Sequence, residues 1–139
     1  MRFVDSNVFI HAFLKPKRNL SQSEARLRES AKKIVTRINS GEKVITSVVH
    51  LAEIANILED NLPLPECARI ERALVMNENI DVASISREDC IAALGEADET
   101  GVGMDDSIAR IVMKRGHMTE IYSFDRDFDT FTDLKRLVE

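Results

Sequence analysis

The sequence predicts a three-layer α/β/α fold, in which a central, mostly parallel sheet of four to five strands is flanked by helices. Short apolar segments that are typical of buried strands alternate with longer amphipathic segments that are typical of helices. Such alternation produces parallel strands whose two faces are both covered. Because no repeat, low-complexity segment or long linker interrupts the chain, we expect one domain over residues 1–139.

The first strand and its helix are expected at the start of the chain. The apolar segment 2–5 predicts a strand, and the segment 6–14 continues as a helix with Ser6 or Asn7 at its N-cap. The polar segment 15–23 then breaks the apolar pattern, so it predicts a loop.

The second unit begins with a long helix. Apolar residues recur every three to four positions over 22–39, which predicts an amphipathic helix that ends at Gly41. The segment 43–46 predicts a second buried strand, and Ser47 is expected to cap the helix 48–60 that follows it.

The rest of the chain repeats this alternation. Helices are expected over 66–77, with Pro63 and Pro65 at its start, over 87–100 after Ser86, and from the opening "GMDDSIARIV" through Arg115. Further strands are predicted at 80–85 and 120–124, with a short fifth strand near 134–138.

Composition and charge exclude several functional classes. Hydrophobic residues make up 44% and charged residues 31% of the chain, without an apolar run near the roughly 18–20 residues of a membrane span. Asp5 and His11 interrupt the apolar N-terminus, so we expect no signal peptide, a cytoplasmic location and no membrane partner. Cys67 and Cys90 lack zinc-site or redox spacing and are expected to be buried free thiols.

The net charge of −5 disfavours passive nucleic-acid binding, but it does not exclude a nuclease whose carboxylates bind cations. Acidic residues fall where such a site would lie. Asp5 ends the first strand and Asp125 the fourth, Asp105 and Asp106 open a helix, and Glu53 lies two turns inside another. Because parallel strands end at one edge of a sheet, these acids are expected to gather there.

Each acid also has a purely structural explanation. Asp5 and Asp105 could be helix caps, the helix dipole could favour Asp106, and Asp125 could belong to a turn. Glu53 could lie in a solvated stripe with His50 and Asn56. Acids that gather at one edge, however, repel one another unless a cation neutralises them. A site without cysteine or paired histidine favours Mg²⁺ or Mn²⁺.

Four segments in this order resemble the PIN-domain ribonucleases, and especially the VapC-type toxins of toxin–antitoxin pairs. "FVDSNVFI" is similar to the opening strand and first acid of the family, and "TSVVHLAEIANIL" to the segment that holds its glutamate. "MDDSIARIV" resembles the helix of the third acid, and "IYSFDRDFD" the strand end with the last acid. The resemblance implies a PIN-like fold over essentially the whole chain.

The resemblance also implies the site and its chemistry. The catalytic and metal-binding acids would be Asp5, Glu53, Asp106 and Asp125, with one or two Mg²⁺ or Mn²⁺ ions and a metal-activated water that cleaves single-stranded or loop RNA. Asp106 is preferred to Asp105 because it precedes a small residue, an apolar residue and alanine, which leaves Asp105 to the cap or the outer shell. The supporting polar candidates are Ser6, Asn7, Asp105, Ser123 and Asp127, and Asp129 is a further acid. Turn or surface roles are the alternative for both Asp127 and Asp129.

The resemblance implies partners that the sequence itself does not contain, namely an RNA substrate, an antitoxin protein and a second copy in a homodimer. Candidates for substrate contact are Lys15, Lys17, Arg18, Lys32 and Lys33, although a solvated surface is the simpler explanation of these residues. His11, His50 and His117 have no catalytic partner and are expected to be structural or surface residues.

Two alternatives differ in class. Haloacid-dehalogenase-like phosphatases need a second aspartate two residues after the first, but Asn7 stands there, and receiver domains need an acidic pair near the first strand. A PIN-like module that has lost its activity and acts as a binding or scaffold protein is the other alternative. The presence of all four acids argues against it.

Overall fold

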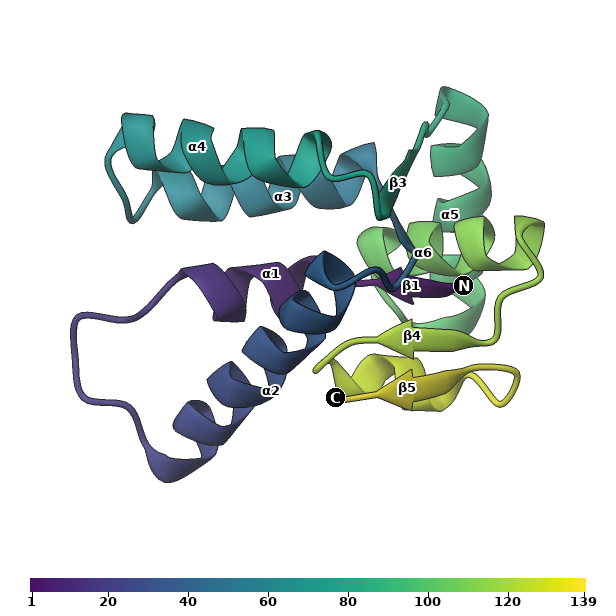
Figure 1. Cartoon of the computed structure of the whole chain (residues 1–139). Helices are drawn as coiled ribbons and strands as arrows, with labels where there is room; N and C mark the ends of the chain where they lie inside the picture. Colours follow the sequence, from purple (N-terminus) through teal and green to yellow (C-terminus); the bar gives the residue numbers. More distant parts are fainter.

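Five short strands form one sheet at the centre of the molecule, in the order β3-β2-β1-β4-β5 (Figure 1). The computed structural model describes residues 1–139. Every neighbouring pair is parallel, which confirms the predicted α/β/α class and includes the short fifth strand. The strands are β1 Arg2–Val4, β2 Val44–Ser47, β3 Ile80–Ala83, β4 Glu120–Tyr122 and β5 Lys135–Leu137.

Helices cover both faces of the sheet and enclose two separate cores. The larger core joins the first four helices to one face, and the smaller core joins the last helix and a 3₁₀ helix to the other face. Phe3 and Val4 show the alternation that makes this possible, because Phe3 points into the smaller core and Val4 into the larger one. The helices are α1 Ser6–Phe13, α2 Gln22–Asn39, α3 Val48–Glu59, α4 Leu64–Val75, α5 Arg87–Thr100, α6 Met104–Arg115 and the 3₁₀ helix η1 Arg126–Thr130.

The expected elements are present, and their boundaries differ at a few points. The loop between α1 and α2 and the helix α2 lie where the sequence predicts them. Pro63 and Pro65 stand at the start of α4, as expected, with Pro63 at its N-cap, and the helix begins at Leu64, two residues before the predicted segment. Proline is compatible with a first turn that needs no N–H donor. The sequence predicted only turn residues where η1 lies.

Two capping assignments were wrong. Asp5, rather than Ser6 or Asn7, occupies the N-cap of α1, yet its side chain accepts no capping hydrogen bond. Gly103, rather than Asp105, occupies the N-cap of α6. In both helices the acid therefore lies at the start of the helix without the local hydrogen bond that defines a cap. A capping bond therefore explains neither acid, although the helix dipole favours negative charge at both positions.

The cap of α5 provides a test of local stability away from the acidic residues. The Ser86 hydroxyl accepts the Asp89 N–H at 3.1 Å, and the Asp89 carboxylate accepts the Ser86 N–H at 2.9 Å. We expect Ser86→Ala to lower the free energy of unfolding by about 1 kcal/mol, because one N–H of the first turn loses its acceptor. Denaturant unfolding measures the change, with the exposed Ser84→Ala as control. Equal stability of both variants would contradict the prediction.

None of the helices combines the length and apolar character that crossing a membrane requires. Both cysteines are free thiols, as expected, and Cys67 is buried, whereas Cys90 is only partly buried.

Candidate functional site

A cavity of about 380 Å³ opens at the carboxyl ends of the strands, and its wall is almost entirely polar. All four acids that the family resemblance singled out line it, although they come from four separate parts of the chain. Asp5 follows β1, Glu53 lies in α3, Asp106 lies in the first turn of α6, and Asp125 follows β4. Ser6, Asn7 and Asp105 line the same cavity.

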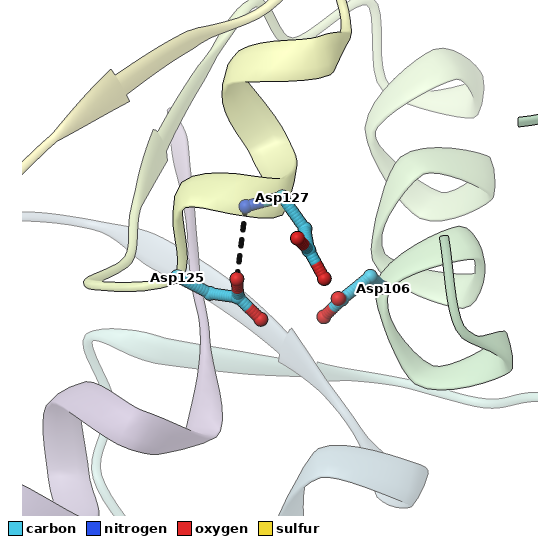
Figure 2. Close-up of side chains that lie close together, drawn as sticks. All are labelled: Asp106, Asp125 and Asp127. Carbon is cyan, nitrogen blue, oxygen red and sulfur yellow. Dashed lines mark hydrogen bonds between the residues drawn. The ribbon is translucent and has the colours of Figure 1, made fainter. Parts of the chain in front are cut away.

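Three carboxylates approach one another most closely. Asp106, Asp125 and Asp127 each offer an oxygen, and these atoms all lie within 4.8 Å of one another. Figure 2 shows the three side chains pointing toward a common space between the start of α6 and the connection from β4 to η1. The Asp127 N–H also donates to Oδ1 of Asp125 at 2.9 Å, so Asp125 shapes the turn and still directs an oxygen toward the cluster (Figure 2).

Asp5 is the most buried acid of the site, with 4% of its surface exposed. The Ser123 hydroxyl donates to its Oδ2 at 2.6 Å, and Ser6 Oγ lies 3.4 Å from its Oδ1. Burial raises the pKa of Asp5, although the hydrogen bond from Ser123 opposes this effect. Since its side chain caps no helix, the capping explanation for this acid is excluded.

Glu53 joins the site through Ser6. The Ser6 hydroxyl donates to Oε2 of Glu53 at 2.6 Å, and this short bond places the glutamate beside Asp5. The alternative of a solvated stripe is wrong, because His50 is fully buried whereas Asn56 is exposed. Glu53 lies between them at the cavity wall, with part of its surface exposed.

Ser123 and Asn7 bind the two ends of the site together. Ser123 Oγ accepts the Asp125 N–H at 3.0 Å and the Asn7 side-chain amide at 3.4 Å, while its own proton goes to Asp5. The Asn7 carbonyl oxygen accepts the Phe124 N–H at 3.3 Å. The two hydrogen bonds of Asn7 span more than one hundred positions of sequence, and they hold the start of α1 against the residues that follow β4.

Like charges dominate the electrostatics of the cavity. Burial, followed by the charges of Asp5, Asp125 and Asp127, raises the pKa of Asp106 to about 8. Without a cation, Asp106 therefore holds a proton at neutral pH, and it shares a hydrogen bond with Asp125. A cluster of oxygen donors that keeps a proton to relieve repulsion is chemically suited to a hard divalent cation that would replace this proton.

Asp129 and Asp105 do not belong to the close cluster. Asp129 pairs with Arg136 through two hydrogen bonds of 2.9 and 3.0 Å, so it stabilises the turn between η1 and β5. Asp105 lines the cavity, but its carboxylate is not among the three that approach one another.

The basic residues that were candidates for substrate contact lie apart from the acids of the site, because no lysine or arginine lines the acidic cavity. Arg18 pairs with Glu24 in two hydrogen bonds, and Lys33 pairs with Glu139. Lys15 and Lys17 are exposed beside a second cavity of about 500 Å³ between the α1–α2 and α3–α4 connections. Lys32 is exposed on α2, 3.6 Å from Glu29.

His50 is the residue that the sequence did not assign to the site. It is 0% exposed, its Nε2 lies 3.9 Å from Oδ1 of Asp5, and burial lowers its pKa to about 4. The one signal in the sequence was a polar residue within the apolar part of a helix, three positions before Glu53. That signal fitted a surface stripe equally well.

The model of the PIN-domain family matches residues 2–134, so this chain belongs to the PIN-domain family. Its fold is that of the VapC-type toxins within this family. Family membership favours the PIN-domain interpretation over the two phosphate-transfer families that the sequence left as alternatives. The sequence itself finds no match among curated proteins.

Solved structures of toxins and toxin–antitoxin complexes share this architecture at low sequence identity. The sarcin–ricin-loop-cleaving toxin VapC20 of Mycobacterium tuberculosis is similar with a TM-score of 0.72 at 19% identity, over 96% of this chain and 98% of that one. A toxin–antitoxin complex from Klebsiella pneumoniae gives 0.69 at 14% identity, over 97% and 96%. VapBC2 of Rickettsia felis, bound to a DNA fragment from its promoter, gives 0.66 at 11% identity, over 98% and 96%.

Proposed function

We propose that this protein is a divalent-metal-dependent endoribonuclease that cleaves single-stranded or loop RNA, and that it is the toxin of a toxin–antitoxin pair. The observation that carries the proposal is the acidic cavity. In it, Asp106, Asp125 and Asp127 lie within 4.8 Å of one another and beside the buried Asp5. Membership of the PIN-domain family and the shared fold with VapC20, a toxin described as cleaving the sarcin–ricin loop, support it.

The donor set fits Mg²⁺ or Mn²⁺. It consists of carboxylate oxygens, which hard cations prefer, and the raised pKa of Asp106 indicates a deficit of positive charge. Asp5, Asp106 and Asp125 would hold the cation, with Glu53 and Asp127 as the further carboxylates beside it. When bound, the cation would neutralise charge on the scissile phosphate and lower the pKa of the attacking water.

The protein's own groups orient the reaction. Ser123 and Ser6 direct the carboxylates of Asp5 and Glu53 toward the cavity through hydrogen bonds of 2.6 Å. Glu53 uses Oε2 for Ser6, which leaves Oε1 at the cavity wall to accept a hydrogen bond from a water molecule. Asn7 holds the two halves of the site at a fixed separation, and such preorganisation lowers the cost of reaching the transition state.

The proposal includes an antitoxin and a homodimer as partners. Two of the structures with the same fold are a toxin–antitoxin complex and a VapBC assembly on promoter DNA, which supports an antitoxin. The exposed Lys15 and Lys17 are offered for contact with RNA outside the acidic cavity, together with Arg18, Lys32 and Lys33.

Metal-linked stability and cleavage test the proposal together. We expect Mn²⁺ at 100 times its dissociation constant to stabilise the protein by about 2.7 kcal/mol, because the folded state alone presents the site. Cleavage of a panel of RNAs is expected to need Mn²⁺ and to be lost in Asp125→Asn. The control is Asp81→Asn, an exposed acid of β3 outside the cavity.

Two results would contradict this proposal in different ways. Full cleavage by Asp125→Asn would exclude the acidic cavity as the active site. If Mn²⁺ neither raised the melting temperature nor supported cleavage, the scaffold alternative would be favoured.

A further inference from the structure

The imidazole of His50 lies beneath the acidic cavity, and the proposed reaction gives it no role. The residue is in the first turn of α3, directly after β2, and its side chain is 0% exposed. The edge of the Phe3 ring packs against it, with the ring centroids 5.0 Å apart and an interplanar angle of 73°. The imidazole is therefore held between the sheet and the site, away from solvent.

The surroundings of the two ring nitrogens of His50 indicate which of them carries the proton. Ser47 Oγ accepts the backbone N–H of His50 at 3.3 Å and lies 2.6 Å from its Nδ1. The hydroxyl has two lone pairs, so this contact by itself fits either tautomer. A bare lone pair on Nε2 would face the Asp5 carboxylate, 3.9 Å away, so the neutral ring is favoured with its proton on Nε2 and with Nδ1 accepting from Ser47.

This Nε2–H has no hydrogen-bond partner, although it is buried. It points toward Asp5, whose Oδ1 is 3.9 Å away, beyond hydrogen-bond distance. Buried donors are almost always satisfied in folded proteins, so an orphan donor that faces a carboxylate needs an explanation. A small rotation of either side chain would bring the two groups into contact.

The negative charges around the imidazole favour a hydrogen-bond donor, rather than a lone pair, at Nε2. The carboxylates of Glu53 and Asp105 act on His50 together with that of Asp5, so three acids face it. With its proton on Nε2, the ring presents an N–H donor, and no lone pair, to Asp5 at the wall of the cavity. It is therefore suited to orient a carboxylate rather than to bind a cation itself.

We propose that His50 is a positioning residue, which donates from Nε2 to Asp5 and fixes the orientation in which this carboxylate binds the divalent cation. The inference rests on the proposed function, because it assigns Asp5 to the cation. Hydrogen bonds to a metal-binding side chain hold it in the orientation that the metal needs, and their loss typically weakens metal binding by about 10–100-fold.

Two substitutions separate positioning from packing. His50→Phe keeps an aromatic ring against Phe3 but removes the donor, and we expect it to weaken Mn²⁺ binding about 10–100-fold in calorimetric titrations. His50→Gln restores an N–H at the position of Nε2, and its Mn²⁺ affinity should stay within about threefold of the unmodified protein. His11→Gln, on the exposed part of α1, is the matched control and should bind Mn²⁺ normally.

A spectroscopic readout does not depend on the variants. In ¹⁵N-labelled protein, the His50 ring is expected to be the neutral Nε2–H tautomer, and its Nε2–H resonance should move downfield when Mg²⁺ is added. An Nδ1–H tautomer, or an unchanged resonance with saturating Mg²⁺, would overturn the positioning role even if His50→Phe failed to fold.

The outcomes also distinguish this inference from the proposed function. If the unmodified protein binds Mn²⁺ and cleaves RNA, and His50→Phe binds Mn²⁺ equally well, the inference alone is wrong. If His50→Phe lowers only the melting temperature of the metal-free protein, the role of His50 is packing. If the unmodified protein neither binds Mn²⁺ nor cleaves RNA, the proposed function fails and the inference fails with it.

Discussion

Asp106→Asn is expected to reduce Mn²⁺-dependent RNA cleavage by at least about 100-fold, while raising the melting temperature of the metal-free protein at pH 8 by about 4 °C. Cleavage falls because the amide cannot replace a charged oxygen in the cluster with Asp125 and Asp127. Stability rises because the substitution removes a carboxylate whose pKa of about 8 reports its repulsion by the neighbouring acids. An opposite change in activity and stability is typical of residues kept for function.

The sign of the stability effect follows from the two pKa values. In the unfolded chain this carboxyl loses its proton near its ordinary pKa of 3.8, whereas in the folded protein it keeps the proton up to about pH 8. Between these values the folded state binds more protons, so its stability falls as the pH rises, and the penalty is complete above pH 8. The difference in melting temperature between Asp106→Asn and the unmodified protein should therefore grow from pH 5.5 to 8 and then level off.

Asp105→Asn provides the contrast within the same helix turn. Because Gly103 holds the cap position, the loss of about 1 kcal/mol that a capping role would predict is not expected. Asp105 lines the cavity without joining the close cluster, so we expect its substitution to reduce cleavage by less than about tenfold. If Asp105→Asn abolished cleavage and Asp106→Asn did not, their assignments would have to be exchanged.

Mn²⁺ binding is expected to release close to one proton at pH 7, because the cation must displace the proton that Asp106 retains. Below the pKa of about 8 the affinity should rise by up to about tenfold for each pH unit, and above it the pH dependence should disappear. Calorimetric titrations in buffers with different ionisation enthalpies measure the number of protons released. Binding without proton release at pH 7 would contradict a protonated Asp106 in the metal-free site.

The Asp106→Asn variant is also the control for this measurement. Residual Mn²⁺ binding by that variant should release clearly fewer protons, because the retained proton belongs to the carboxyl that has been removed. Because the pKa of Asp5 is also raised, Asp5 is a second possible source of the released proton, and the variant must be compared with the unmodified protein. Proton release that was equal in both proteins would assign the titrating group to Asp5 instead.

Local features of the sequence predicted most of the fold. The alternation of strands and helices, the loop before α2 and the capping box of α5 depend on residues within a few positions of one another. The positions of two acids were also predicted locally, because Asp5 comes directly after β1 and Asp125 comes shortly after β4. The caps of α1 and α6 were wrong because residues suited to capping, Ser6 and Asn7 in one helix and Asp105 in the other, lie within the first turn rather than at the residue before it.

The sequence alone predicted the class of fold and the edge of the sheet where Asp5, Glu53, Asp106 and Asp125 gather, since strand ends follow from periodicity and parallel strands end at one edge. The strand order β3-β2-β1-β4-β5 came only from the structure. The tertiary structure alone decided which side chains meet. It brought Asp127 into the cluster and turned Asp129 toward Arg136. It also buried His50 beneath Asp5, because burial and hydrogen-bond partners depend on segments that are distant in sequence, such as Ser123 and Asp5.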